Sequence, residues 1–179
     1  MKNGINRRSF FRAGGTLAAG AAGLVVDSDA ASAASGIRSE RERNPGATVL
    51  PYPRKVIARA KQLLLGAPVR FTFPDEASPC VVLKNGRPVP GGVGPERDIA
   101  AFSTMCPHMG CPTAYDAKER VFRCPCHFSM FDAELSGQMV CGQATVDLPE
   151  IVLEYDASSD SVIAVCVRGL LYGRSSNIL

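Results

Sequence analysis

The hydrophobic residues that follow residue 68 come in short runs bounded by turn-forming residues. Five such runs lie at residues 69–73, 80–84, 99–103, 151–155 and 161–167. Runs of this length that are rich in Val, Ile and Phe are typical of β-strands. Asn85-Gly86 ends the second run with a dipeptide that favours a hairpin turn, and residues 156–160 join the last two runs as another hairpin. The pattern predicts a small all-β domain.

Residues 54–65 fit two kinds of secondary structure. The apolar stripe of a helix would contain Val56, Ile57, Ala60, Leu63 and Leu64. The strand expected at 69–73, beyond the turn at 66–68, makes an extended structure the alternative. Periodicity alone leaves both open.

The first 33 residues have the layout of an export signal. Arg7 and Arg8 precede an apolar run rich in Ala and Gly at 13–26, and small residues follow as far as Ala33. This order is typical of a bacterial twin-arginine signal peptide. The apolar run is shorter than the roughly 20 residues that a membrane-spanning helix needs. We therefore expect export to the periplasm and cleavage near Ala33, with retention as a membrane anchor as the alternative.

Residues 34–53 are polar and contain several prolines, which predicts an extended arm ahead of a folded domain at 54–179. The formal net charge is +3, and it becomes close to neutral without residues 1–33. Nucleic-acid-binding domains cluster Lys and Arg on one face, and this chain has no such cluster in its sequence. We expect no nucleic-acid partner.

The chain contains two histidines, and both lie in two short segments with four of the seven cysteines. The segments are Cys106-Pro-His108-Met-Gly110-Cys111 and Cys124-Pro-Cys126-His127-Phe-Ser129. Each offers one thiolate and one imidazole, so two adjacent loops could present two Cys to one iron and two His to another. A [2Fe–2S] cluster with this ligand set has a reduction potential of roughly −150 to +300 mV.

A structural zinc site is the alternative, because two Cys and two His are also a common zinc ligand set. Zinc fingers pair Cys with Cys and His with His at short spacing, whereas each pair here is mixed. Zinc also gives no role to Cys111 and Cys126. The spacing therefore favours an iron–sulfur centre.

The patterns C-x-H-x-G-C and C-P-C-H-x-S in these segments resemble the signature of Rieske iron–sulfur proteins. The resemblance implies one [2Fe–2S] cluster per chain. The ligands that it implies are Cys106, His108, Cys124 and His127. It also implies a disulfide between Cys111 and Cys126, a bond that suits an exported protein.

The same resemblance implies the Rieske fold, in which three small antiparallel sheets carry the cluster-binding loops at one tip. The cluster loops are expected at 106–111 and 124–129, with a cover loop at 142–149 that shields the cluster from water. In this fold residues 54–65 are expected to contain a strand.

Two positions depart from the respiratory Rieske proteins, which usually have Gly after the last His ligand and Tyr four positions after it. This chain has Phe128 and Phe131 there. Ser129 is retained, and its hydroxyl can donate a hydrogen bond to a cluster sulfur and favour the reduced state. Since Phe131 has no hydroxyl, we expect a lower reduction potential than that of quinol-oxidising Rieske proteins.

Further motifs resemble the small subunit of arsenite oxidase. They are Phe73-Pro-Asp75, Ser78-Pro-Cys80, 91–95, Met130-Phe131-Asp132, 169–174 and Asn177. The resemblance implies an electron-transfer subunit of an oxidoreductase, with no substrate chemistry on this chain. Its implied partners are a molybdopterin-containing large subunit and a periplasmic cytochrome c or cupredoxin acceptor.

Three other functions remain as alternatives. The quinol-oxidising subunit of a cytochrome bc complex would retain an N-terminal anchor and the Tyr that Phe131 replaces. A cytoplasmic ferredoxin that feeds a dioxygenase would lack both the disulfide pair and the export signal. A zinc-stabilised interaction module would carry no redox centre.

The remaining cysteines, Cys80, Cys141 and Cys166, are expected to act as small hydrophobic residues in or beside strands. Because their number is odd, at least one has no disulfide partner among them.

Overall fold

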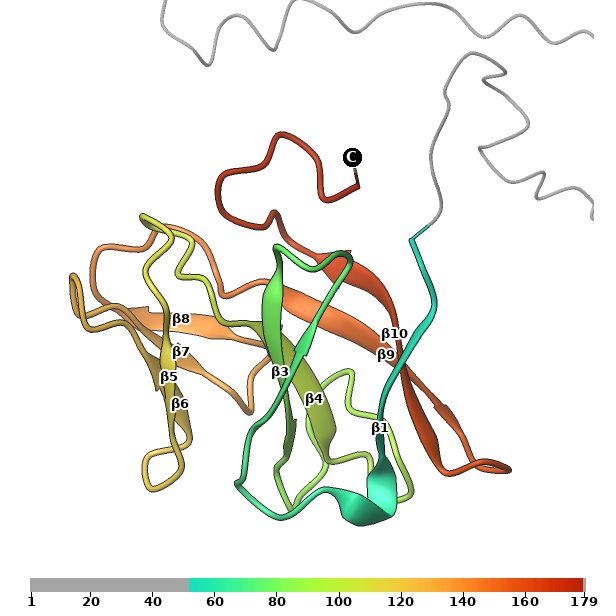
Figure 1. Ribbon diagram of the computed structural model, residues 1–179. Helices are drawn as coiled ribbons and strands as arrows, with labels where there is room; N and C mark the ends of the chain where they lie inside the picture. The colour runs from blue at the N-terminus through green and yellow to red at the C-terminus, as the bar shows by residue number, and fades with distance from the viewer. Residues whose placement is uncertain (1–51, 179) are drawn as a thin grey trace, which may run out of the picture. The chain divides into compact units, whose positions relative to one another are not determined.

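The computed structural model describes residues 52–178 (Figure 1). The predicted signal peptide at 1–33 and the predicted arm as far as residue 51 lie outside the described residues. The described elements are β1 (Lys55–Arg59), η3 (Ala60–Gln62), β2 (Val69–Thr72), β3 (Pro79–Lys84), β4 (Ile99–Ser103), β5 (Ala114–Asp116), β6 (Val121–Arg123), β7 (Met130–Asp132), β8 (Gln138–Cys141), β9 (Glu150–Asp156) and β10 (Ser161–Arg168). Within this part of the chain, no helix has the length and apolar character that crossing a membrane requires.

The strands form two antiparallel sheets, so the expected all-β class is confirmed. One sheet has the strand order β1-β10-β9-β4-β3-β2, and the other has the order β5-β6-β7-β8. The resemblance implied three sheets, whereas the structure has two. Pairing of β4 with β9 joins two groups of three strands into one six-stranded sheet. Only two residue pairs make this join, Ala101 with Ile151 and Phe102 with Glu150.

Residues 54–65 begin with β1 and continue in the short 3₁₀ turn η3. β1 pairs with β10 at the edge of the larger sheet. The helical stripe therefore does not form. Two of its five members are exposed instead, Val56 by 61% and Leu64 by 71%. Ala60 and Leu63 are buried.

The two hairpin signals have different outcomes. β9 and β10 pair directly across residues 156–160, as expected. β3 and β4 also pair, but the connection between them spans residues 85–98 instead of a two-residue turn at Asn85-Gly86. Asp98 closes this long loop at its base: its carbonyl accepts the Asn85 N–H (2.8 Å), and its carboxylate accepts the Gly86 N–H (3.0 Å).

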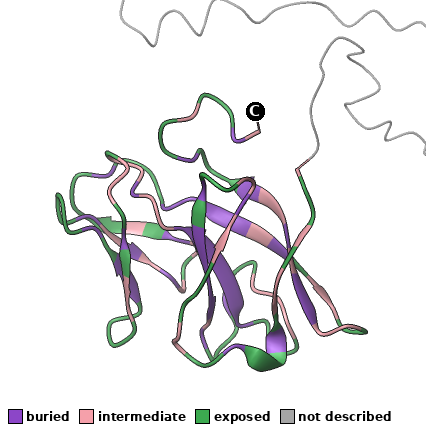
Figure 2. Ribbon diagram, viewed as in Figure 1, coloured by how far each residue is buried: buried purple, intermediate pink, exposed green. Residues whose placement is uncertain are grey.

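β3 and β4 separate the two cores of the domain. Cys80 and Val82 of β3 pack into one core, whereas Val81 and Leu83 pack into the other. β4 alternates in the same way, and it is buried along its whole length (Figure 2). Alternate side chains of a strand point to opposite faces, so burial on both faces explains why these strands are continuous apolar runs.

The second core joins β3 and β4 to the smaller sheet, directly behind the two histidine-containing segments. Phe102 of β4 meets Phe122 of β6 edge to face, with 5.4 Å between ring centroids. Cys106, Cys124 and Phe131 belong to this core. The smaller sheet is thereby fixed to the larger one through apolar contacts at the candidate site.

Candidate metal centre

The first cluster loop, residues 106–111, connects β4 to β5. Its ends are held together by the Cys106 N–H, which donates to the Cys111 carbonyl (2.9 Å). The Gly110 N–H turns back to the Cys106 carbonyl (2.8 Å) with a φ of 73°. A Cβ on Gly110 would lie 2.4 Å from the Tyr172 ring, so the C-terminal segment packs closely on this loop.

The second cluster loop, residues 124–129, connects β6 to β7 and repeats this backbone pattern. The Cys124 N–H donates to the Ser129 carbonyl (2.8 Å), and the Phe128 N–H donates to the Cys124 carbonyl (3.1 Å). Phe128 has a φ of 60° and so occupies the position that Gly110 has in the first loop. The two loops are a structural pair, each closed by the same two hydrogen bonds.

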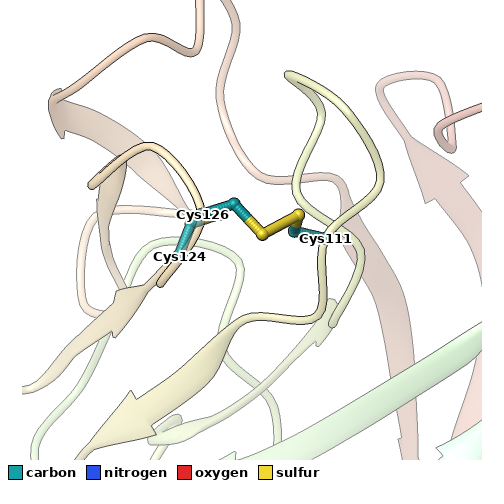
Figure 3. A group of neighbouring side chains, drawn as sticks. All are labelled: Cys111, Cys124 and Cys126. Atoms are coloured by element: carbon teal, nitrogen blue, oxygen red, sulfur yellow. A yellow bond between two sulfur atoms is a disulfide. The ribbon is translucent and has the colours of Figure 1, made fainter.

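A disulfide between Cys111 and Cys126 links the two loops, with 6.5 Å between the two Cα atoms (Figure 3). The pairing expected from the resemblance is therefore confirmed. The sulfur atoms of Cys111, Cys124 and Cys126 lie within 4.8 Å of one another. They are not a metal-binding trio, because the disulfide leaves Cys124 as the one free thiol among them.

The four expected ligands lie in the two loops as a pair of imidazoles and a pair of thiols. The rings of His108 and His127 are 4.8 Å apart and nearly perpendicular, at 84°. Cys106 and Cys124 are buried, and this burial, together with the neighbouring Cys124 thiol, contributes to a raised pKa of the Cys106 thiol. His127 is exposed, whereas His108 is half-buried.

These residues fit a Rieske cluster. His108 Nδ1 is buried and has no hydrogen-bond partner among the described residues. A buried polar atom without a partner costs free energy, and coordination to iron would satisfy it. Two adjacent thiols and two adjacent imidazoles supply the donor atoms that a [2Fe–2S] cluster of this type requires.

Burial is the main reason that the pKa of the Cys106 thiol is raised, because it disfavours the thiolate. The backbone N–H groups of His108 and Met109 point at this sulfur and act in the opposite direction. The loop thus has donors in place to stabilise negative charge on the sulfur once iron is bound.

Ser129 is fully buried and connects the second loop to residues 142–149, the expected cover loop, which we call the cover segment. Its hydroxyl oxygen accepts the N–H groups of Gln143 (3.1 Å) and Ala144 (3.0 Å). The hydroxyl proton remains available for a cluster sulfur, as the sequence predicts. Gly142 allows this contact: a Cβ there would lie 2.3 Å from Ser129 Cα and 2.7 Å from the Phe128 carbonyl oxygen.

Phe131 has no exposed surface and packs in the same core as Cys106 and Cys124. Of the other cysteines, Cys80 is buried, which raises the pKa of its thiol to about 12. Cys166 is partly buried, but Cys141 is exposed on the edge strand β8 and does not pack as a hydrophobic residue.

The C-terminal contacts of the site were not assigned a role from the sequence. Arg174 donates to the Asp75 carboxylate (2.6 and 2.8 Å) and to the Ser78 hydroxyl (2.7 Å). Asn177 spans the same segment by accepting the Leu171 N–H and donating to the Gly169 carbonyl. These bonds hold residues 169–177 where Tyr172 meets Gly110. The sequence analysis noted Asp75, Ser78, Arg174 and Asn177 only as members of the motifs that resemble arsenite oxidase.

Comparison with known proteins matches residues 54–152 to the Rieske [2Fe-2S] domain. The iodate reductase subunit IdrB of Denitromonas iodatirespirans is 35% identical over 176 residues, which cover 97% of this chain and 86% of that protein. The iodate reductase subunit IdrB of Pseudomonas sp. (strain SCT) is 37% identical over 128 residues, covering 70% of this chain and 66% of that protein.

Among solved structures, the soluble domain of the Rieske protein II (soxF) from Sulfolobus acidocaldarius matches with a TM-score of 0.61 and 26% sequence identity. The match covers 69% of this chain and 82% of that domain. Together with the paired loops and the donor atoms between them, these findings show that the chain belongs to the Rieske [2Fe–2S] family and carries a [2Fe–2S] cluster.

Proposed function

We propose that Cys106, His108, Cys124 and His127 hold the cluster and that the chain transfers electrons for a periplasmic oxidoreductase. The observation that supports this ligand set is the orphaned Nδ1 of His108 beside the buried thiols. The cluster accepts and releases one electron at a time. The protein contributes a dry, apolar environment on one side, from Phe131 and the second core, and an exposed imidazole on the other.

The parent enzyme, in this proposal, is a molybdopterin oxidoreductase that converts an inorganic oxyanion. The 35% identity to an iodate reductase subunit, along 97% of the chain, carries this part of the proposal. Iodate is therefore the first substrate to test. The secondary motifs that resemble arsenite oxidase, such as Phe73-Pro-Asp75, favour arsenite as the second.

The two substrates require opposite directions of electron flow. Reduction of iodate takes electrons from a donor through this chain to the catalytic subunit. Oxidation of arsenite sends electrons from the catalytic subunit through this chain to a cytochrome c or a cupredoxin. In both cases the substrate reacts on the partner, and this chain connects that reaction to a periplasmic electron carrier.

Affinity purification of the tagged full-length chain from its own host tests the proposal. We expect a larger subunit in fixed ratio, molybdenum in the preparation, and a reduced-state EPR signal with an average g below the free-electron value. The complex should oxidise a reduced dye with iodate, or reduce an oxidised dye with arsenite. A preparation that contains a cytochrome b and oxidises quinol would contradict the proposal.

The ligand set has its own test in the purified chain. Replacing His127 with Cys keeps a donor atom but should abolish the Rieske EPR signal, because the second iron would lose one of its two imidazoles. Replacing Ala157 with Ser, at an exposed position in the turn between β9 and β10, should leave the signal unchanged. A full Rieske signal in the His127→Cys protein would exclude this residue as a ligand.

A further inference from the structure

Phe128 has a backbone conformation that its residue type does not favour. Its φ of 60° places it in the left-handed region, where the Cβ of an L-residue approaches the following carbonyl oxygen. The equivalent position of the first loop is Gly110, which has no Cβ. A glycine would therefore satisfy the second loop without this strain.

The other non-glycine residues with positive φ in residues 52–178 are all polar. They are Arg97, Arg120, Ser136 and Asp160. Polar residues with hydrogen-bonding side chains are the usual exceptions to the glycine preference, and a large aromatic residue is a genuine outlier. Strained residues of this kind cluster at functional sites, so Phe128 calls for a functional explanation.

Packing within the described chain does not offset the strain. The Phe128 side chain is 78% exposed, the highest value among the large hydrophobic side chains in residues 52–178. An aromatic ring in this position exposes apolar surface to water and gains almost none of the free energy that its burial would supply.

The two cluster loops around Phe128 and His127 carry no charged side chain. Neither cluster loop contains Asp, Glu, Lys or Arg. Met109 of the first loop is 57% exposed. A groove of about 300 Å³ lies beside Phe128, lined by Cys124, Pro125 and Met130 among others. The one charged residue in its lining, Arg123, is paired with Asp116 (3.0 Å).

Such a surface fits a permanent subunit interface. The buried centre of an interface is depleted in charged residues and enriched in aromatic residues and Met, and permanent interfaces are the more hydrophobic ones. A soluble electron carrier that binds briefly relies on complementary charge for steering, and the two loops offer none.

We propose that Phe128 is a docking anchor, whose ring is buried against the catalytic subunit when the two chains assemble. The proposal rests on the proposed function, because it commits to that subunit as the occupant. The strain at φ 60° persists in the free chain because the ring is needed in the complex. Phe128 thus trades stability of the free chain for affinity.

Three substitutions separate strain from binding. Phe128→Gly removes both the ring and the strain, Phe128→Ala removes the ring and keeps the strain, and Phe128→Tyr keeps both. The molybdenum-containing subunit that co-purifies with the wild-type chain is isolated and titrated against each variant. EPR verifies that every variant contains its cluster. Leu135→Ala is the matched control, because Leu135 is 51% exposed on the turn at the opposite end of the smaller sheet.

We expect Phe128→Gly and Phe128→Ala to raise the dissociation constant at least tenfold, as loss of a buried aromatic anchor does. Phe128→Tyr and Leu135→Ala should bind within about twofold of the wild type, a change too small to reflect loss of an anchor. In contrast, only Phe128→Gly should raise the melting temperature of the free chain, by about 2–4 °C. A residue with a merely structural role would not increase stability and decrease affinity in the same variant.

Three results would overturn the anchor. One is undiminished binding of Phe128→Gly to a subunit that the wild type does bind. The second is a melting temperature of Phe128→Gly at or below that of Phe128→Ala. The third is slower electron exchange with a soluble cytochrome c while subunit binding stays unchanged, which would assign the surface to the carrier. If no catalytic subunit binds the wild type, the proposed function fails together with the anchor.

Discussion

Phe131 is fully buried in the core behind the cluster loops. Its ring has no hydroxyl that could donate a hydrogen bond. Phe131→Tyr would add a hydroxyl to this ring, in the core that also contains the thiols of Cys106 and Cys124. A net hydrogen bond is worth about 1 kcal/mol. We expect the reduction potential to rise by about 40 mV, because a one-electron couple changes by about 59 mV for each tenfold shift in equilibrium.

Potentiometric titration of the EPR signal measures this change. Phe73→Tyr is a suitable control, since Phe73 is equally buried but packs in the other core. A Phe131→Tyr protein whose potential stays at the wild-type value would show that the ring position is too far from the ligands to donate a hydrogen bond.

The two cluster loops and the Rieske domain that they define were predictable from the sequence, because each motif is local and needs only a tight loop. Three features at this scale could not be predicted. The positive φ of Phe128 follows from the hydrogen bonds that close its loop. The bonds from residues 143 and 144 to Ser129 join segments that are 14 and 15 residues apart. The exposure of Cys141 depends on β8 being an edge strand.

At the scale of the elements, the cover segment is held to the second loop by a contact that excludes any side chain at position 142. Gly142 has a φ of 102°, and a Cβ would meet backbone atoms of Phe128 and Ser129 at 2.7 Å or less. Gly142→Ala should therefore destabilise the protein by more than about 2 kcal/mol and separate the cover segment from Ser129.

Two measurements check this prediction: the midpoint of urea unfolding, and the rate at which the visible absorbance of the cluster is lost in air. Gly173→Ala is the matched control. Gly173 also has a positive φ, 78°, but has no atom within 4 Å of the position of a Cβ. It should show only the backbone cost and lose its cluster at the wild-type rate. Equal effects of the two substitutions would mean that steric contact at Gly142 is unimportant.

The C-terminal segment is tied to the turn before β3 by Arg174 and Asp75. The hydrogen bond from Arg174 holds the pKa of the Asp75 carboxyl below its usual range. A lowered folded-state pKa stabilises the fold above the unfolded pKa of about 3.9, and the stabilisation is lost as the pH falls through the lower, folded value. Arg174→Gln should therefore reduce stability at pH 7.

The difference between wild type and Arg174→Gln should shrink when unfolding is measured near pH 3. The effect at pH 7 should be small, because the Asp75 side chain is 41% exposed and the pair is screened by water. Urea midpoints at the two pH values test the sign. A difference that stays constant between them would show that Arg174 acts through packing and not through the ion pair.

Secondary structure was predictable where one strand pairs with its neighbour in the sequence, as β9 does with β10. It was less predictable where distant segments decide the outcome. Asn85-Gly86 has the local chemistry of a tight turn, but Asp98, 12 residues further on, accepts the Gly86 N–H and closes a long loop instead. The fusion of two expected sheets depends on two pairs between β4 and β9, which no local pattern encodes.

For the molecule as a whole, assembly of the site has two requirements. The apolar core that includes Phe102, Phe122 and Phe131 must be complete before the loops can hold the four ligands in place. The cluster must also be inserted while iron and sulfur are supplied in the cytoplasm. Both requirements are met if the protein folds and receives its cluster before export.

The paired arginines at residues 7 and 8 predict this order, because twin-arginine export carries folded proteins. Replacing both Arg7 and Arg8 with Lys should leave a folded chain, with its Rieske EPR signal, in the cytoplasm. Wild-type cells should carry the signal in the periplasmic fraction, on a chain that begins close to Ala34. Replacing Arg12 with Lys is the matched control, since it alters a basic residue outside the pair. Periplasmic signal in the double variant would contradict twin-arginine export, and a full-length chain in the membrane fraction of wild-type cells would show that residues 13–26 serve as an anchor.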